Sequence, residues 1–213
     1  MFFENYSKNP FYCFKGLYFC NNQINVTVYI HTSDAEMAVQ HELEKLIQRC
    51  KKGDSQAFND LIKRYSNRCY AYFYRLTGRA DLSDELLSDL FIRLVRKIGS
   101  FEGGSFDKWI FTVASNIFRD YLRRHYRQKR LLAEKADLLR NDADNTDRAP
   151  EIFDELHMAL EKLDPETAEL ITLRYFSQLS FKELAEIRDE PIGTTLSKVH
   201  RGVKKLRQIM EDS

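Results

Sequence analysis

Apolar residues recur at helical spacing along most of this 213-residue sequence. Four such stripes follow one another between His41 and Tyr121, separated by glycine-containing turns, and the pattern resumes after residue 150. The chain contains only 8 Gly and 4 Pro, which is too few for the many turns of a β-rich fold. The sequence therefore predicts an all-α protein.

A polar segment divides the predicted helices into two groups. Residues 134–155 carry eight acidic and three basic side chains, and residues 141–150 are almost devoid of apolar ones. A segment of this composition cannot support a packed core and is typical of a flexible linker. We therefore expect two small helical domains, residues 41–130 and 151–213, joined by a flexible acidic linker over residues 131–150.

The second domain ends in a predicted helix-turn-helix. Asp164 and the proline after it form a strong helix start, and Ser180 with Glu183 forms a capping box that opens a short helix. A tight connection leads to a longer basic helix that begins near Gly193. Asp189 occupies the turn position where a glycine is expected, and Asp tolerates the left-handed backbone better than most residues. In this arrangement the second helix enters the major groove of DNA.

Charge is unevenly distributed, although the formal net charge is only +1. Residues 119–130 contain six Lys or Arg and one acid, and residues 193–207 contain five Lys or Arg and no acid. Each run alone is also compatible with a solvated helix face. Two such runs in two domains instead predict two contacts with one phosphate backbone.

The predicted helix after Gly78 begins with acids and has no compensating base in that stretch. These acids suit the dipole at a helix N-terminus, which is the simplest interpretation. An acidic surface also repels DNA, so we expect it to face a protein. The residues concerned are Asp81, Asp84, Glu85 and Asp89.

Residues 1–40 differ from the rest of the chain. The first twenty positions are rich in aromatic residues, and the apolar residues from Ile24 to Ile30 alternate with polar ones as in a strand. The segment lacks the basic start and clean apolar run of a signal peptide. We interpret it as a disordered extension or as a mis-assigned start, with Met37 the natural beginning. A small hairpin or a partner-binding addition is the remaining alternative.

The sequence shows no recognisable catalytic, metal or cofactor site. Its four cysteines form no C-x-x-C pair and no histidines cluster, so we expect reduced thiols without a metal. It contains no phosphate-cradling glycine loop, no H-E-x-x-H and no nucleophile elbow. No apolar run approaches the roughly 18 residues that a membrane helix needs. We therefore expect a cytoplasmic protein that has no membrane segment, needs no cofactor and is not an enzyme.

The order and spacing of these segments resemble bacterial RNA polymerase sigma factors of the extracytoplasmic-function (ECF) type, in the sigma-70 family. The resemblance covers about residues 41–210. The matching segments are Gly53–Tyr65, Ser83–Phe91, Phe106–Ile110, Val113–Asn116, Asp120–Arg124, Leu173–Phe176, Leu179–Glu186, Pro191–Thr194 and Ser197–Arg201. In this family the first domain corresponds to region 2 and the second to region 4.

The resemblance implies a protein that binds core RNA polymerase, recognises and melts promoters and directs transcription initiation. An anti-sigma factor is a further partner that the family suggests. Contacts with the −10 promoter element are expected from Phe101, Ser105, Phe106, Asn116, Arg119, Arg123 and Arg124. Contacts with the −35 element are expected from Thr194, Thr195, Ser197, Lys198, Arg201 and Lys204. Contacts with polymerase are expected from Asp84, Glu85, Leu87, Ser88, Asp89 and Phe91.

The chemistry of promoter melting suits the first of these sets. A base must leave the stack and be held in a pocket. The Gly103–Gly104 loop supplies backbone freedom, Asn116 can hydrogen-bond a base edge, and the nearby arginines can hold phosphates. Trp109 and Phe106 can serve either as stacking surfaces or as core residues, and for Trp109 we favour the core.

Besides Asp189, three positions depart from the family pattern. In the polymerase-docking segment Ser88 replaces the usual glutamine and Asp89 the usual glutamate, and Leu196 stands where the family often has a basic residue. Two other functions also fit parts of the sequence. A free-standing helix-turn-helix transcriptional regulator would not bind core polymerase, and residues 41–130 would be its sensory or dimerising domain. A protein that only sequesters polymerase or a regulator would not need Lys198 and Arg201.

Overall fold

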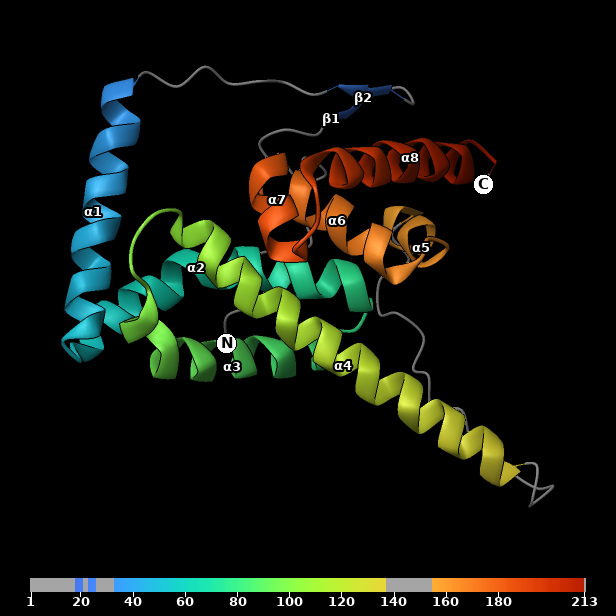
Figure 1. The fold of residues 1–213 in the computed structure, drawn as a ribbon, viewed down its shortest axis with the longest axis horizontal. Helices are drawn as coiled ribbons and strands as arrows, with labels where there is room; N and C mark the ends of the chain where they lie inside the picture. Colours follow the sequence, from blue (N-terminus) through green and yellow to red (C-terminus); the bar gives the residue numbers. More distant parts are fainter. Residues whose placement is uncertain (1–17, 21–22, 26–32, 137–154, 213) are drawn as a thin grey trace. The chain divides into compact units, whose positions relative to one another are not determined.

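The computed structural model describes residues 18–20, 23–25, 33–136 and 155–212 (Figure 1). The chain divides into two compact units, Met1–Gln40 and His41–Ser213. In the first unit, β1 (Tyr18–Cys20) and β2 (Gln23–Asn25) form an antiparallel hairpin in which Phe19 lies opposite Ile24. A small hairpin is one of the alternatives that the sequence leaves open, and the later part of the predicted strand lies outside the described residues.

All other described elements are helices, so the prediction of an all-α protein is confirmed. The larger unit begins within α1 (Ser33–Lys51), which starts upstream of the expected position. It continues with α2 (Ser55–Thr77), α3 (Ala80–Lys97), a 3-10 turn at Ile98–Ser100, and α4 (Phe106–Ala136). Its second half comprises α5 (Glu155–Glu161), α6 (Pro165–Tyr175), α7 (Phe181–Arg188) and α8 (Ile192–Glu211). None of the described helices is long and apolar enough to cross a lipid bilayer.

Helix α4 is longer than the sequence pattern predicts. It continues to Ala136, into the range expected to be linker, and in Figure 1 its C-terminal part extends past the ends of α2 and α3. Residues 127–132 are Arg, Gln, Lys, Arg, Leu and Leu, all strong helix formers, with no Gly or Pro to end the helix. The rest of the expected linker lies outside the described residues.

The helix boundaries follow local capping signals. The Asp54 carboxylate accepts hydrogen bonds from the backbone N–H groups of Gln56 and Ala57 at 2.9 and 3.1 Å, which opens α2. These bonds, with that of Ala57 foremost, lower the pKa of Asp54. Helix α2 ends at Gly78, whose φ of 63° is left-handed, a conformation that glycine adopts without strain.

The predicted helix-turn-helix is present as α7, a tight turn and α8. Ser180 and Glu183 form the capping box of α7 with both of its hydrogen bonds. Asp164 caps α6 by accepting from the N–H of Thr167 at 2.9 Å. The turn after α7 is closed by Asp189 in the left-handed conformation, with φ 51° and ψ 48°. These local predictions are confirmed.

The core of the first half is built from aromatic rings. Phe106 stacks on Trp109 with centroids 5.4 Å apart, and the edges of Tyr65 and Phe101 meet the same ring at 5.2 and 5.3 Å. Trp109 packs against the core as expected. Cys69 is fully buried and burial raises its pKa to about 12, so it behaves as a small apolar residue.

Candidate nucleic-acid interface

One face of α4 presents exposed polar and cationic groups. Asn116, Arg123 and Arg127 are spaced by seven and four residues, which places them on the same side of a helix, and all three are exposed. The Arg123 side chain is 72% exposed, and its Nη1 lies 3.1 Å from Asp120 Oδ1 one turn earlier in the helix. Arg124 is exposed beside them. This surface, which we call the α4 basic face (Asn116, Arg123, Arg124 and Arg127), can contact a phosphate backbone and a base edge.

The glycine loop before α4 is exposed, but the two aromatic rings that flank it are not. Gly103 and Gly104 both have positive φ, and Ser105 is exposed, with its Oγ accepting from the N–H of Lys108 at 3.1 Å. Phe101 and Phe106 are 6% and 2% exposed and belong to the aromatic core. The rings therefore pack against protein and present no face to DNA in this structure, in contrast to the contacts expected from the sequence.

Arg119 faces the second half of the unit instead of solvent. Its Nη2 donates to Ser115 Oγ and, at 3.3 Å, to the carbonyl oxygen of Ile187, and its Nε lies 3.6 Å from Glu169 Oε2. The sequence pattern predicts that this arginine holds a phosphate together with Arg123. In this structure its guanidinium contacts protein groups instead.

Glu169 of α6 is the centre of a buried polar cluster that joins the two halves. The residue is 1% exposed, and its carboxylate accepts hydrogen bonds from Tyr72 of α2 at 3.1 Å, from Ser115 of α4, and from Arg188 of α7 at 2.9 Å. Burial, followed by the nearby Glu169 charge, raises the pKa of Tyr72 far above its usual value, so its hydroxyl remains a donor. We call Glu169 with Tyr72, Ser115, Arg119 and Arg188 the Glu169 cluster.

Two further contacts hold the halves together. Lys108 of α4 pairs with Glu186 of α7 at 2.5 Å. Arg68 of α2 donates to the carbonyl oxygen of Ser177 in the second half at 2.8 Å, and it also pairs with Asp107 within the first half at 2.8 Å. No sequence pattern indicates these pairs, since they join residues far apart along the chain.

Some of the residues predicted to contact DNA on helix α8 are exposed to solvent, and others are held by bonds within the protein. Thr194, Ser197, Arg201 and Lys204 are exposed. Thr195 is completely buried and its hydroxyl donates to Glu190 Oε1 at 2.9 Å, so it fixes the turn and presents no group to DNA. Its prediction as a DNA contact is therefore not matched by its position.

Lys198 is held by two carboxylates. Its Nζ lies 2.6 Å from Glu166 Oε1 of α6 and 2.6 Å from Glu190 Oε2 at the turn. The hydrogen bond to Glu166, and then that to Glu190, raises the pKa of Lys198, and the hydrogen bond from Lys198 lowers the pKa of Glu166. The ammonium is thus turned toward its own domain, and a DNA contact would require these bonds to break.

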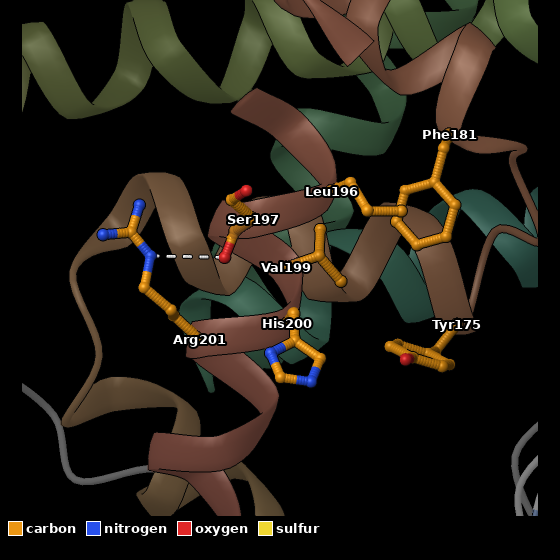
Figure 2. Close-up of a pocket in the computed structure, with 7 residues that line it drawn as sticks. All are labelled: Tyr175, Phe181, Leu196, Ser197, Val199, His200 and Arg201. Carbon is orange, nitrogen blue, oxygen red and sulfur yellow. Dashed lines mark hydrogen bonds between the residues drawn. The ribbon is translucent and has the colours of Figure 1, made fainter. Parts of the chain in front are cut away.

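An open groove of about 750 Å³ lies along the other side of α8 (Figure 2). Within it, Arg201 Nε donates to the carbonyl oxygen of Ser197 at 3.3 Å. The groove is lined by both apolar and polar side chains. Its lining residues are Tyr175, Phe181, Leu196, Ser197, Val199, His200 and Arg201.

Helix α3 carries the acids that are expected to face a protein. Asp84, Glu85 and Ser88 are exposed there, and Leu87, Asp89 and Phe91 are half-buried. The structure adds two apolar residues to this surface, because Ile92 is 49% and Val95 is 50% exposed. Val95 follows Leu87 and Phe91 at four-residue spacing, a pattern that predicts burial, and no sequence pattern singles out Ile92. We call the exposed set (Asp84, Glu85, Ser88, Ile92 and Val95) the α3 docking face.

Among the described residues, no group of three or more His, Cys, Asp or Glu side chains is placed to hold a metal ion. His157 of α5 is buried, and its ring lies against Gly78, with Nδ1 3.2 Å from the carbonyl oxygen of Arg75 and Nε2 3.2 Å from Glu161. Sequence reasoning missed both His157 and Glu169. The one signal for Glu169 is a single acid within the otherwise uncharged run Ala168–Leu173.

Comparison with known proteins gives matches over both halves. The family model for Sigma-70 region 2 matches residues 61–128, and that for Sigma-70 region 4 matches residues 153–206. The chain is 34% identical over 185 residues to the ECF RNA polymerase sigma-E factor of Haemophilus influenzae, covering 78% of this chain and 93% of that protein. It is 29% identical over 185 residues to the ECF RNA polymerase sigma factor SigW of Bacillus subtilis, covering 80% and 97%.

The structure is also similar to a solved one. It matches the sigma factor RpoE of Bartonella quintana, determined in complex with the anti-sigma factor NepR, with a TM-score of 0.59 and 23% identity. The match covers 72% of this chain and 96% of that chain. At this identity the likeness concerns the fold.

Proposed function

The chain belongs to the extracytoplasmic-function group of the sigma-70 family of RNA polymerase sigma factors, and we propose how its two halves divide the work of promoter recognition. As a sigma factor it recognises promoters and directs transcription initiation. The first half, residues 41–136, acts at the −10 element and on core polymerase. The second half, residues 155–211, acts at the −35 element.

One observation carries this division of labour: exposed cations lie on two helices that belong to different halves of the chain. The α4 basic face offers the Asn116 amide to a base edge and Arg123 and Arg124 to phosphates. On α8, Thr194, Ser197 and Arg201 occupy the early turns and Lys204 a later one. A recognition helix contacts bases through its N-terminal residues, and cations farther along contact phosphates.

The α3 docking face is the proposed contact with core polymerase. Its acids leave it unsuited to DNA, and two half-exposed apolar side chains, Ile92 and Val95, provide area that a protein partner can bury. The departure at Ser88 is compatible with this role, because its Oγ donates to the carbonyl oxygen of Asp84 at 2.8 Å within the helix. The partner is then held by the neighbouring acids and apolar groups.

Reconstituted transcription tests the proposal. Wild-type chain is combined with core RNA polymerase that lacks its own sigma factor, and promoters are selected from a random library. Reversing charge with Asp84→Arg and Glu85→Arg is expected to abolish association with core, whereas the control Glu155→Arg, at an exposed acid on α5, retains it. Asn116→Ala is expected to bind promoter DNA but to lose strand opening, measured as permanganate reactivity of unpaired thymines.

The second half has its own arm in this test. Arg201→Ala is expected to weaken holoenzyme binding to duplex promoter and to flatten the log–log salt dependence by about 0.9 for each phosphate that the arginine neutralises. A wild-type chain that fails to associate with core polymerase would overturn the whole proposal. Promoter firing that is unaffected by Arg201→Ala and by Asn116→Ala would overturn the assigned interfaces.

A free-standing helix-turn-helix regulator is the weaker alternative. It accounts for α7 and α8 but gives no purpose to the exposed amide and arginines of α4. The region 2 match over residues 61–128 also covers the part that this alternative treats as a sensory or dimerising domain.

Further partners and the place of action follow from the same proposal. We extend to this chain an anti-sigma factor as a partner, because the similar RpoE of Bartonella quintana is bound by one. RNA polymerase and promoter DNA place the proposed action in the cytoplasm. The polymerase supplies the chemistry of RNA synthesis, so the chain itself acts as a specificity subunit and not as an enzyme.

A further inference from the structure

Two large apolar side chains lie exposed in the first turns of α8. Ile192 is 53% and Leu196 is 49% exposed, and a spacing of four residues places them on the same side of the helix. The buried residues of α8 are Thr195, Val199, Gly202 and Leu206, so Ile192 and Leu196 lie outside its buried stripe. Exposed leucines are common on protein surfaces, so the surroundings of Leu196 matter more than its exposure alone.

Leu196 lies among groups suited to a nucleic acid. Ser197 and Arg201 are exposed on the adjoining turns, and Lys204 follows one turn later. Lys198, the other cation of these early turns, is held by Glu166 and Glu190. The side of α8 that carries Leu196 therefore presents an apolar side chain and a hydroxyl group, with cations nearby. These groups complement an anionic partner that also exposes an apolar group.

The major groove of DNA presents one such apolar group. Each base pair shows hydrogen-bond donors and acceptors there, and thymine alone adds a methyl group at C5. Leu196, Phe181 and Tyr175 line the same groove (Figure 2). A methyl group placed against Leu196 is thus bordered by apolar side chains on the protein side.

We propose that Leu196 reads a thymine methyl group in the −35 element and so sets a preference for an A·T pair at one position. This inference rests on the proposed function of α8 and names a base contact that the basic residues of the helix do not provide. It also gives a physical role to the departure at this position, where an apolar side chain replaces the basic residue often found in the family.

Removal of a single methyl group from the DNA tests the proposal. Holoenzyme is formed from the full chain and core polymerase, and a promoter is chosen by selection from a random library. Each thymine of its −35 element is replaced in turn by deoxyuridine, which keeps every hydrogen-bonding group and lacks only the methyl. At one position, loss of the methyl group is expected to lower the affinity of the holoenzyme for the promoter about three- to fivefold, which is the contribution of one buried methyl group.

Substitutions in the protein identify which side chain senses that methyl. Leu196→Ala is expected to bind thymine and deoxyuridine promoters equally at the sensitive position. The control Met158→Ala, which trims an apolar side chain that is 37% exposed on α5, is expected to keep the wild-type ratio. In a new selection, Leu196→Arg is expected to change the preferred pair at that position from A·T to G·C, since Arg pairs with the acceptors of guanine.

Two results would overturn the inference while leaving the proposed function intact. One is tight promoter binding by wild-type holoenzyme with no thymine sensitive to methyl removal. The other is an unchanged thymine-to-deoxyuridine ratio in Leu196→Ala, which would show that another group reads the methyl, or that the groove serves a protein partner. Failure of wild-type holoenzyme to bind any selected promoter would instead contradict the proposed function itself.

Discussion

Replacement of Glu169 by glutamine is expected to destabilise the packed halves strongly. Removing one partner of a buried ion pair typically costs about 3–5 kcal/mol, because it leaves a charge without compensation. Arg188 keeps a second carboxylate, since its Nη2 lies 2.6 Å from Glu166, and the Tyr72 hydroxyl can still donate to an amide oxygen. Arg119 makes no other carboxylate contact in the described structure. The expected loss therefore lies at the lower end, at about 3 kcal/mol.

Urea unfolding of the full chain measures this loss. With a slope of about 2 kcal/mol per molar urea, a loss of about 3 kcal/mol lowers the midpoint by about 1.5 M. Far-UV circular dichroism follows all helices, and the single tryptophan, Trp109, reports on the first half alone. The control Glu155→Gln makes the same chemical change at an exposed site and is expected to alter stability by no more than about 0.5 kcal/mol.

The expected size of the effect depends on burial of the carboxylate. A midpoint for Glu169→Gln within about 0.3 M of wild type would refute this dependence, because a shift that small matches an exposed site. Such a result would mean that Glu169 is hydrated in solution and that the Glu169 cluster does not hold the halves together.

Three further changes test other features of the fold. Asp189→Gly is expected to change the free energy of unfolding by less than about 1 kcal/mol. Asp189→Val is expected to lower it by about 1–2 kcal/mol, because a β-branched residue suits a φ of 51° poorly. Urea midpoints that rank the two variants in the opposite order would contradict this. Gly78→Ala is expected to lower the thermal midpoint sharply, because φ is 63° and an added Cβ would lie 2.0 Å from His157 Nε2. If Gly78→Ala lowers the midpoint equally in the wild type and in a His157→Ala background, no clash with the His157 ring contributes. Glu166→Gln is expected to unfold at lower urea than wild type at pH 7, because a carboxyl with a lowered pKa stabilises the fold while it is ionised. The difference in urea midpoint should shrink as the pH falls from 4.5 through the lowered pKa of Glu166, and a difference that does not shrink in acid would exclude the pairing with Lys198 as its source.

Predictions that depend on neighbours in sequence were confirmed. The cap at Asp164, the capping box at Ser180 and the left-handed Asp189 all involve residues within a few positions of one another. Their physics is local, because a helix end exposes unpaired amides that the nearest suitable side chain satisfies. The fold class followed from the same kind of information, since helical periodicity is visible in any window of a dozen residues.

Features that depend on distant residues were not predictable. The sequence marks Phe101 and Phe106 as neighbours of a flexible loop, but only the packing of Tyr65 and Trp109 shows that both rings are buried. Similarly, Lys198 belongs to a basic run, and its pairing depends in part on Glu166 from a different helix. A sequence gives the chemical type of such a side chain, whereas its direction is set by the tertiary fold.

The inward position of Arg119 and the burial of Glu169 depend on each other. Residues 119–130 place six cations on α4, and a period of 3.6 residues puts four of them, Arg119, Arg123, Arg127 and Arg130, within about a quarter of the helix circumference. The one that contacts protein is Arg119, which lies one turn after the buried Ser115. Arg123 follows one turn later on the same side of the helix, and its side chain is 72% exposed. A cation on the inner face needs a buried anion, and α6 supplies Glu169. Position along α4 therefore separates the arginine that binds the protein from those available to phosphate, because Arg119 lies where α4 meets α6 and α7 and the later arginines do not.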